Sequence, residues 1–126
     1  MKEADYYKKL ENDEVKCFLC PRHCIIKNGF RGYCRARYNK EGTLFTENEY
    51  ISALALDPIE KKPLFKFFPG SKILSVGGSG CNFRCIFCQN WQISQCENQN
   101  HIKIKPKELA EKALELVVEG NIGLAY

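Results

Sequence analysis

Three closely spaced cysteines are the residues of this chain best suited to chemistry. Cys81, Cys85 and Cys88 have the spacing Cys-x3-Cys-x2-Cys and follow the glycine-rich segment Gly77–Gly80. A cubane 4Fe-4S cluster normally takes four cysteine ligands, so three thiolates leave one iron free to bind a small molecule. An open metal position is typical of a catalytic site. The spacing therefore predicts a catalytic iron–sulfur cluster.

The cysteine triplet, with the aromatic Phe87 just before its last cysteine, resembles the signature of radical S-adenosylmethionine (SAM) enzymes. The match is closest to the branch that activates glycyl-radical enzymes. Within that branch, three further segments resemble the radical SAM member of the AmmeMemoRadiSam system: Cys17–Cys24, Ala55–Leu64 and Cys88–Trp91. The likeness extends from about Cys17 to Tyr126.

The resemblance implies a cofactor set and a reaction. Cys81, Cys85 and Cys88 would hold three irons of a 4Fe-4S cluster, SAM would chelate the fourth, and Phe87 would lie against the adenine or shield the cluster. An external one-electron reductant, such as flavodoxin or ferredoxin, would drive cleavage of SAM to methionine and a 5'-deoxyadenosyl radical. That radical would abstract hydrogen from a protein glycine or another unreactive C–H group. The protein's task would be positioning and shielding, as in a pyruvate formate-lyase activating enzyme.

A second cysteine group precedes the first in the chain. Its spacing is Cys-x2-Cys-x3-Cys-x9-Cys, and four thiolates can close a tetrahedral site. Zinc suits such a site, but an auxiliary iron–sulfur cluster uses the same ligands, and spacing does not choose between them. Cys96 stands apart from both groups and is expected to be a free thiol. The members of the second group are Cys17, Cys20, Cys24 and Cys34.

Two other function classes stay open. In a zinc-stabilised binding module without catalysis, both cysteine groups would hold zinc, but they lie too far apart for an ordinary zinc ribbon. In an electron carrier both would hold clusters, but neither matches the cysteine run of bacterial ferredoxins. Gly77–Gly80 lacks the spacing of a phosphate-binding loop and the Lys-Ser/Thr pair that completes one.

Composition narrows the class of protein. The 126 residues are 44% hydrophobic and 27% charged, which is typical of one soluble globular domain. No apolar stretch approaches the ~20 residues of a membrane span, and the charged N-terminus lacks signal-peptide features. We therefore expect a cytoplasmic protein without a membrane partner, in which eight cysteines ligate metal rather than form disulfides. The net charge of +4 is spread among acidic residues, which argues against nucleic-acid binding.

The elements that must position the cysteines follow from periodicity and turn residues. Leu64–Phe68 reads as a strand or an apolar loop. The other expected elements are a short helix over Ala4–Glu11, strands over Thr43–Thr46, Tyr50–Leu56 and Lys72–Val76, a turn over Glu47–Glu49, a helix from Pro106 to about Glu119 capped by Gly120, and a parallel strand over Ile122–Tyr126.

Together these elements predict an α/β fold. Residues 71–126 would form the first βα unit and the second strand of a truncated, partial (β/α) radical SAM barrel. Residues 1–70 would form a small cysteine-rich, β-containing module. The triplet then lies at the carboxyl end of a strand, where sites in parallel α/β folds sit. Because one βα unit cannot cover both faces of a parallel sheet, we expect an N-terminal fragment that is incomplete for activity by itself.

Overall fold

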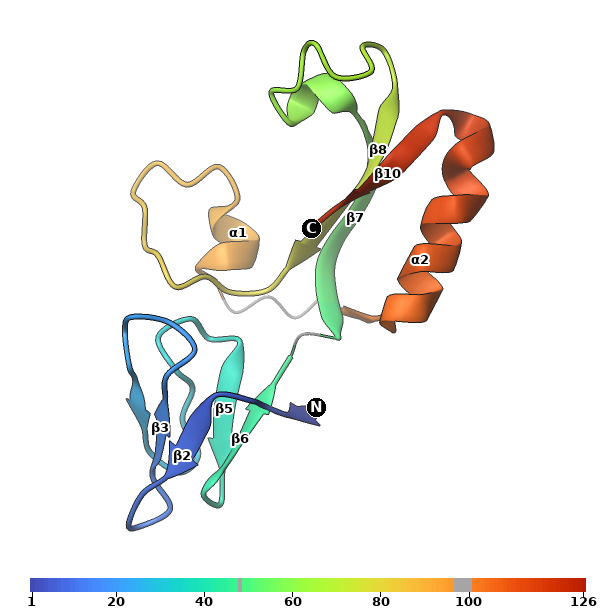
Figure 1. Ribbon diagram of the computed structural model, residues 1–126. Helices are drawn as coiled ribbons and strands as arrows, with labels where there is room; N and C mark the ends of the chain where they lie inside the picture. The colour runs from blue at the N-terminus through green and yellow to red at the C-terminus, as the bar shows by residue number, and fades with distance from the viewer. Residues whose placement is uncertain (48, 97–100) are drawn as a thin grey trace.

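A computed structural model describes residues 1–47, 49–96 and 101–126 and shows three small β-sheets (Figure 1). Two antiparallel sheets of three strands form the N-terminal module. The first has the order β1-β6-β5 and the second the order β2-β3-β4. Their strands are β1 (Lys2–Glu3), β2 (Tyr7–Lys9), β3 (Val15–Cys17), β4 (Ile25–Ile26), β5 (Arg37–Lys40) and β6 (Thr43–Thr46).

A small core joins these two sheets. In β3, Val15 and Cys17 are buried and Lys16 between them is not, because successive side chains of a strand point to opposite faces. The fully buried Asn39 of β5 donates its side-chain amide to the carbonyls of Asp13 and Ile26, at 2.8 and 2.7 Å, and so ties the first sheet to the second. The buried hydrophobic cluster consists of Ala4, Val15, Cys17, Ile26 and Leu44.

The third sheet has four strands in the order β10-β8-β7-β9. β10 is parallel to β8, whereas β7 is antiparallel to both of its neighbours. Ile51, Leu74 and Val76 are buried in it. In Figure 1 this sheet lies above the two N-terminal sheets. Its strands are β7 (Tyr50–Pro58), β8 (Lys72–Gly78), β9 (Ile102–Lys103) and β10 (Asn121–Ala125).

Helix α2 (Pro106–Glu115) and the 3-10 turn Leu116–Glu119 connect β9 to β10, and α2 lies beside β10 (Figure 1). The Glu108 carboxylate accepts a hydrogen bond from the Lys105 backbone N–H at 2.9 Å, which caps the first turn of the helix. Gly120 ends the segment at φ +90°, a conformation that glycine adopts without strain. Two shorter elements are the 3-10 turn Ile59–Lys61, after β7, and helix α1 (Trp91–Ser94).

The expected start of a partial (β/α) barrel is wrong. The described residues form small, mostly antiparallel sheets, and the protein is β-rich with little helix. The reason is the pairing of β7, which runs antiparallel to β8 from Pro58↔Lys72 to Ile51↔Gly78. This pairing gives β8 a partner from the segment before it, on the side opposite the parallel strand β10. The division into residues 1–70 and 71–126 stays a prediction.

Single elements were predicted with mixed success. The strands at β6, β7, β8 and β10 and the helix at α2 are confirmed. The helix over Ala4–Glu11 is wrong, because β2 occupies it and pairs with β3, and Tyr6 has φ +61°. Leu64–Phe68 is a loop. The turn expected over Glu47–Glu49 includes residue 48, which lies outside the described residues, so this turn stays a prediction. Among the helices of the described ranges, none has the length and apolar character needed to cross a membrane.

Candidate metal centre

The cysteine triplet lies in the loop that leaves the carboxyl end of β8 and leads to α1 (Figure 1). Gly80 begins this loop at φ +80°, and its backbone N–H donates to the carbonyl of Ile93 in α1 at 2.8 Å. A Cβ atom at Gly80 would lie 2.0 Å from the carbonyl oxygen of Cys34, a separation that no side chain could tolerate. Glycine is therefore required where the loop passes the N-terminal module.

Hydrogen bonds hold the loop around its thiols. Cys81 Sγ accepts from the Phe83 backbone N–H at 3.4 Å, and the Gln95 side-chain amide donates to the Cys85 carbonyl at 2.9 Å. Cys88 Sγ lies 3.3 Å from Ser94 Oγ, and this hydrogen bond lowers the pKa of the Cys88 thiol below its usual value. A lowered pKa favours the thiolate, which is the form that binds metal.

The donor chemistry of the triplet fits an iron–sulfur cluster, although its ligand geometry is not formed. All eight cysteines are free thiols, and Cys81, Cys85 and Cys88 are half-buried. Within residues 1–47, 49–96 and 101–126, no three Cys, His, Asp or Glu side chains converge closely enough to hold one ion. A change of χ1 between staggered rotamers moves a cysteine sulfur by about 3 Å. The loop would have to close around a cluster by such rotations.

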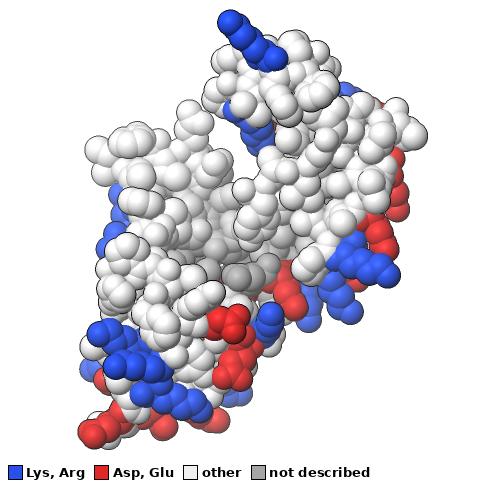
Figure 2. Space-filling model, in the orientation of Figure 1, with Lys and Arg blue, Asp and Glu red and all other residues white. Residues whose placement is uncertain are grey.

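Exposed apolar side chains surround the triplet. Phe87 is 82% exposed, so it does not pack into the described part of the protein. Phe83, Ile86 and Trp91 are exposed as well. Figure 2 shows few Lys, Arg, Asp or Glu side chains on the side of the molecule where this loop lies. Such a surface suits contact with an apolar or aromatic group, and the role of Phe87 in cofactor binding stays a prediction.

The second cysteine group is brought together around one cavity. This cavity has a volume of about 120 Å³. The buried Arg37 donates from Nη1 to Cys17 Sγ at 3.4 Å. Burial raises the pKa of the Cys34 thiol, and the nearby thiols of Cys17 and Cys24 raise it further. The lining of the cavity includes all four predicted members of the group, Cys17, Cys20, Cys24 and Cys34.

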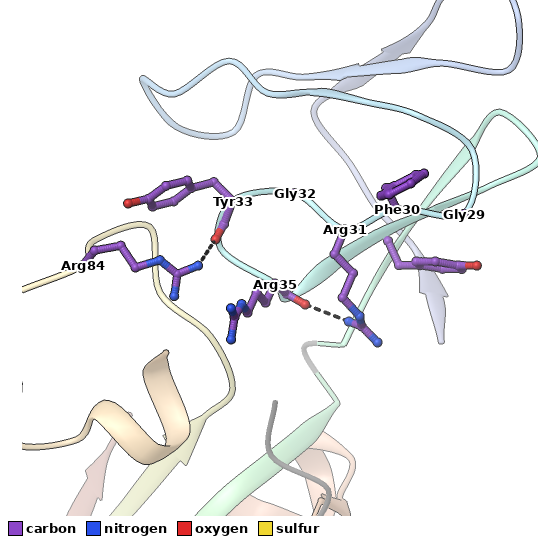
Figure 3. A pocket seen from close by; sticks show the side chains of 8 residues that line it. Gly29, Phe30, Arg31, Gly32, Tyr33, Arg35 and Arg84 are labelled. Atoms are coloured by element: carbon purple, nitrogen blue, oxygen red, sulfur yellow. Dashed lines mark hydrogen bonds between the residues drawn. The ribbon is translucent and has the colours of Figure 1, made fainter. Parts of the chain in front are cut away.

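Backbone contacts join the two cysteine groups, and sequence reasoning missed them. The Cys81 N–H donates to the Cys34 carbonyl at 3.1 Å. Arg22 donates from Nε to the Asn82 carbonyl at 2.6 Å, and Arg84 donates from Nη2 to the Tyr33 carbonyl at 2.8 Å, as the dashed line in Figure 3 shows. The sequence carries no signal for these contacts, because a main-chain acceptor leaves no residue type to recognise.

Figure 3 shows a shallow pocket of about 430 Å³ where the loop meets the N-terminal module. Its arginines could suggest an anion site, but their donors reach protein groups. Arg31 donates to the Arg35 carbonyl and pairs with the Glu47 carboxylate, both at 2.7 Å. Arg35 donates to the Gln95 carbonyl. Arg35 therefore links the module to the residue after α1, whereas Arg31 binds groups within the module.

Comparisons with known proteins find two relatives, both from Methanocaldococcus jannaschii. The uncharacterized protein MJ0808 is 47% identical over 117 residues, which are 90% of this chain and 35% of that protein. The uncharacterized protein MJ0674 is 34% identical over 101 residues, 75% of this chain and 25% of that protein. The chain thus spans about a third or less of these relatives' length. No protein-family model matches it, and no solved structure shows significant similarity.

Proposed function

We propose that this chain carries the cluster-binding loop of a radical SAM enzyme, with Cys81, Cys85 and Cys88 as the ligands of a 4Fe-4S cluster. The observation that supports this best is the placement of the motif. Three free thiols lie in one loop at the carboxyl end of β8, next to the parallel strand β10. In α/β folds, ligand sites occur at the carboxyl ends of parallel strands, and β8 and β10 are the parallel pair of this mixed sheet.

The loop's own residues supply binding and orientation. Ser94 favours the thiolate of Cys88, and Gln95 holds the carbonyl of Cys85, so α1 and the residue after it contact two of the three cysteines. The exposed aromatic rings of Phe83 and Phe87 offer a surface for the adenine of SAM and would keep water from the cluster. When bound, the cluster and SAM supply a 5'-deoxyadenosyl radical that abstracts hydrogen, and a protein glycine is the proposed substrate.

Anaerobic reconstitution of the full chain tests this proposal. We expect about four irons and four sulfides per chain at the triplet, and 5'-deoxyadenosine when SAM and a one-electron reductant, such as reduced flavodoxin or dithionite, are added to a longer protein that contains this chain. Cys85→Ala should lose both the cluster and SAM cleavage. Cys96→Ala is the matched control, because Cys96 is an exposed thiol outside both groups, and it should retain both.

Two outcomes would contradict the proposal. SAM cleavage that persists in Cys85→Ala would show that the triplet does not bind the catalytic cluster. Zinc bound at both cysteine groups, without iron or sulfide, would favour the alternative, a zinc-stabilised binding module. The cavity shared by Cys17, Cys20, Cys24 and Cys34 supports zinc at one of those two groups.

A further inference from the structure

The N-terminal module has very little apolar core for its size. Its buried hydrophobic cluster contains five residues, one of which is Cys17. Modules this small are commonly stabilised by disulfides or a structural metal. All the cysteines are free, so disulfides do not supply that stabilisation here. A metal ion bound to thiols would do so.

The cavity beside this core has the ligands for such an ion. Four thiols line it, without carboxylate or imidazole, and Ile26 contributes an apolar wall. Four thiolates form a closed tetrahedral zinc site. The buried guanidinium of Arg37 touches Cys17 Sγ and would offset the negative charge of a zinc ion with four thiolates.

We propose that Cys17, Cys20, Cys24 and Cys34 bind one zinc ion, and that this ion fixes the backbone on which the Cys81–Cys88 loop docks. The four thiols line one cavity without converging on one point, and a rotation about χ1 moves a cysteine sulfur by about 3 Å. Zinc–sulfur bonds of about 2.3 Å would then draw the four residues together.

Cys34 is the link between the zinc site and the loop. Its side chain lines the cavity, while its carbonyl accepts the N–H of Cys81 at 3.1 Å. Beside it, the Tyr33 ring contacts both Arg22 and Arg84, whose guanidinium carbons are 3.5 and 4.8 Å from the ring centroid. Both arginines also bind main-chain carbonyls across the junction. Zinc that orders Cys34 therefore favours the docked loop, and docking favours zinc binding by the same factor.

Zinc binding itself is tested on the full chain, stripped of metal by a chelator under anaerobic conditions and titrated with Zn²⁺, or with Co²⁺ as a spectroscopic probe of thiolate ligands. We expect about one ion per chain at the four-cysteine site. The triple variant Cys81→Ser, Cys85→Ser, Cys88→Ser and the control Cys96→Ser should retain this ion, and Cys34→Ser should lose it. Loss of the ion in the triple variant instead, or iron and sulfide at this site, would overturn the proposal.

Loop docking is tested by hydrogen exchange of the backbone amides of residues 80–88. We expect zinc to increase their protection by about tenfold. Gly80→Ala keeps all four zinc ligands, but its Cβ meets the Cys34 carbonyl, so it should keep the ion and lose the protection. Equal protection in zinc-loaded wild type and Gly80→Ala would refute the docking step, even if the metal-free protein did not fold.

Both readouts are independent of the radical SAM proposal. Zinc binding and loop protection without any iron at the triplet would support this inference and contradict the proposed function. An iron–sulfur cluster at the triplet of a protein that binds no zinc would support the proposed function and contradict the zinc inference.

Discussion

Asp57, near the end of β7, shows how single charges stabilise this fold. Its two carboxylate oxygens lie 2.8 Å from Lys61 Nζ and 3.5 Å from Lys62 Nζ. The hydrogen bond from Lys61 is the main cause that lowers the pKa of Asp57 from 3.8 to about 2. A carboxylate whose pKa is lower in the folded than in the unfolded state stabilises the fold above about pH 4. That contribution is lost as the pH falls to about 2.

We expect Asp57→Asn to lower the free energy of unfolding at pH 7 by about 1 kcal/mol or less, the range of partly exposed ion pairs. The variant should also lose less stability than the wild type between about pH 4 and pH 2. Urea denaturation over that range measures both. Glu111→Gln is a suitable control, because Glu111 is more exposed and lies 3.8 Å from its lysine. An unchanged pH slope in Asp57→Asn would show that the ion pair contributes nothing.

At the residue scale, the sequence revealed the cysteine side chains of the candidate site but not the hydrogen bonds that hold them in place. The spacing of Cys17, Cys20, Cys24 and Cys34 predicted that they form one group, and the structure places all four around one cavity. The role of the Cys34 carbonyl could not be predicted, because every residue has a carbonyl and only the fold decides where it points. The same holds for Arg22 and Arg84, which bind backbone oxygens.

Asn121 connects three elements at the first residue of β10. Its Oδ1 accepts the Leu74 N–H of β8 at 2.8 Å, and its Nδ2 donates to the Ala113 carbonyl of α2 at 2.8 Å. The residue is buried. Asn121→Ala would leave one backbone donor and one acceptor without partners, and we expect a loss of about 1–3 kcal/mol in the free energy of unfolding. Chemical denaturation monitored by circular dichroism measures it.

The matched control is Asn28→Ala, which removes an exposed asparagine that accepts one hydrogen bond, from the Glu41 N–H at 2.9 Å. Water can replace that hydrogen bond, so the free energy of unfolding should fall much less in Asn28→Ala than in Asn121→Ala. Equal losses in the two variants would mean that Asn121 does not hold β10, β8 and α2 together.

Elements with a strong local signal were predicted well, and elements that depend on distant partners were not. Pro106 and Gly120 bound the helical segment between them, as expected, because both act through their own backbone. The region of Tyr7–Lys9 has helix-compatible residues but is a strand, since it pairs with β3. The barrel expectation failed for the same reason: the pairing of β7 with β8 is a tertiary choice that periodicity does not encode.

At the scale of the whole molecule, the four-stranded sheet has an apolar edge. In the order β10-β8-β7-β9, β10 has a neighbour on one side only within the described residues. Its Ile122 and Leu124 are exposed, as are Val117 and Val118 in the turn before it. An edge strand with unpaired backbone groups and apolar side chains favours pairing with a second chain.

We therefore expect this chain to self-associate as its concentration rises, and Ile122→Lys to keep it monomeric to higher concentration. A lysine on an edge strand opposes pairing, because docking a second strand would bury its charge. Sedimentation velocity at several concentrations measures the effect. Val118→Lys adds the same charge at a site that is 91% exposed and outside the sheet, so it should associate as the wild type does. Equal effects of the two lysines would assign the change to net charge rather than to the β10 edge, and a wild type that is monomeric at every concentration would contradict the expectation outright.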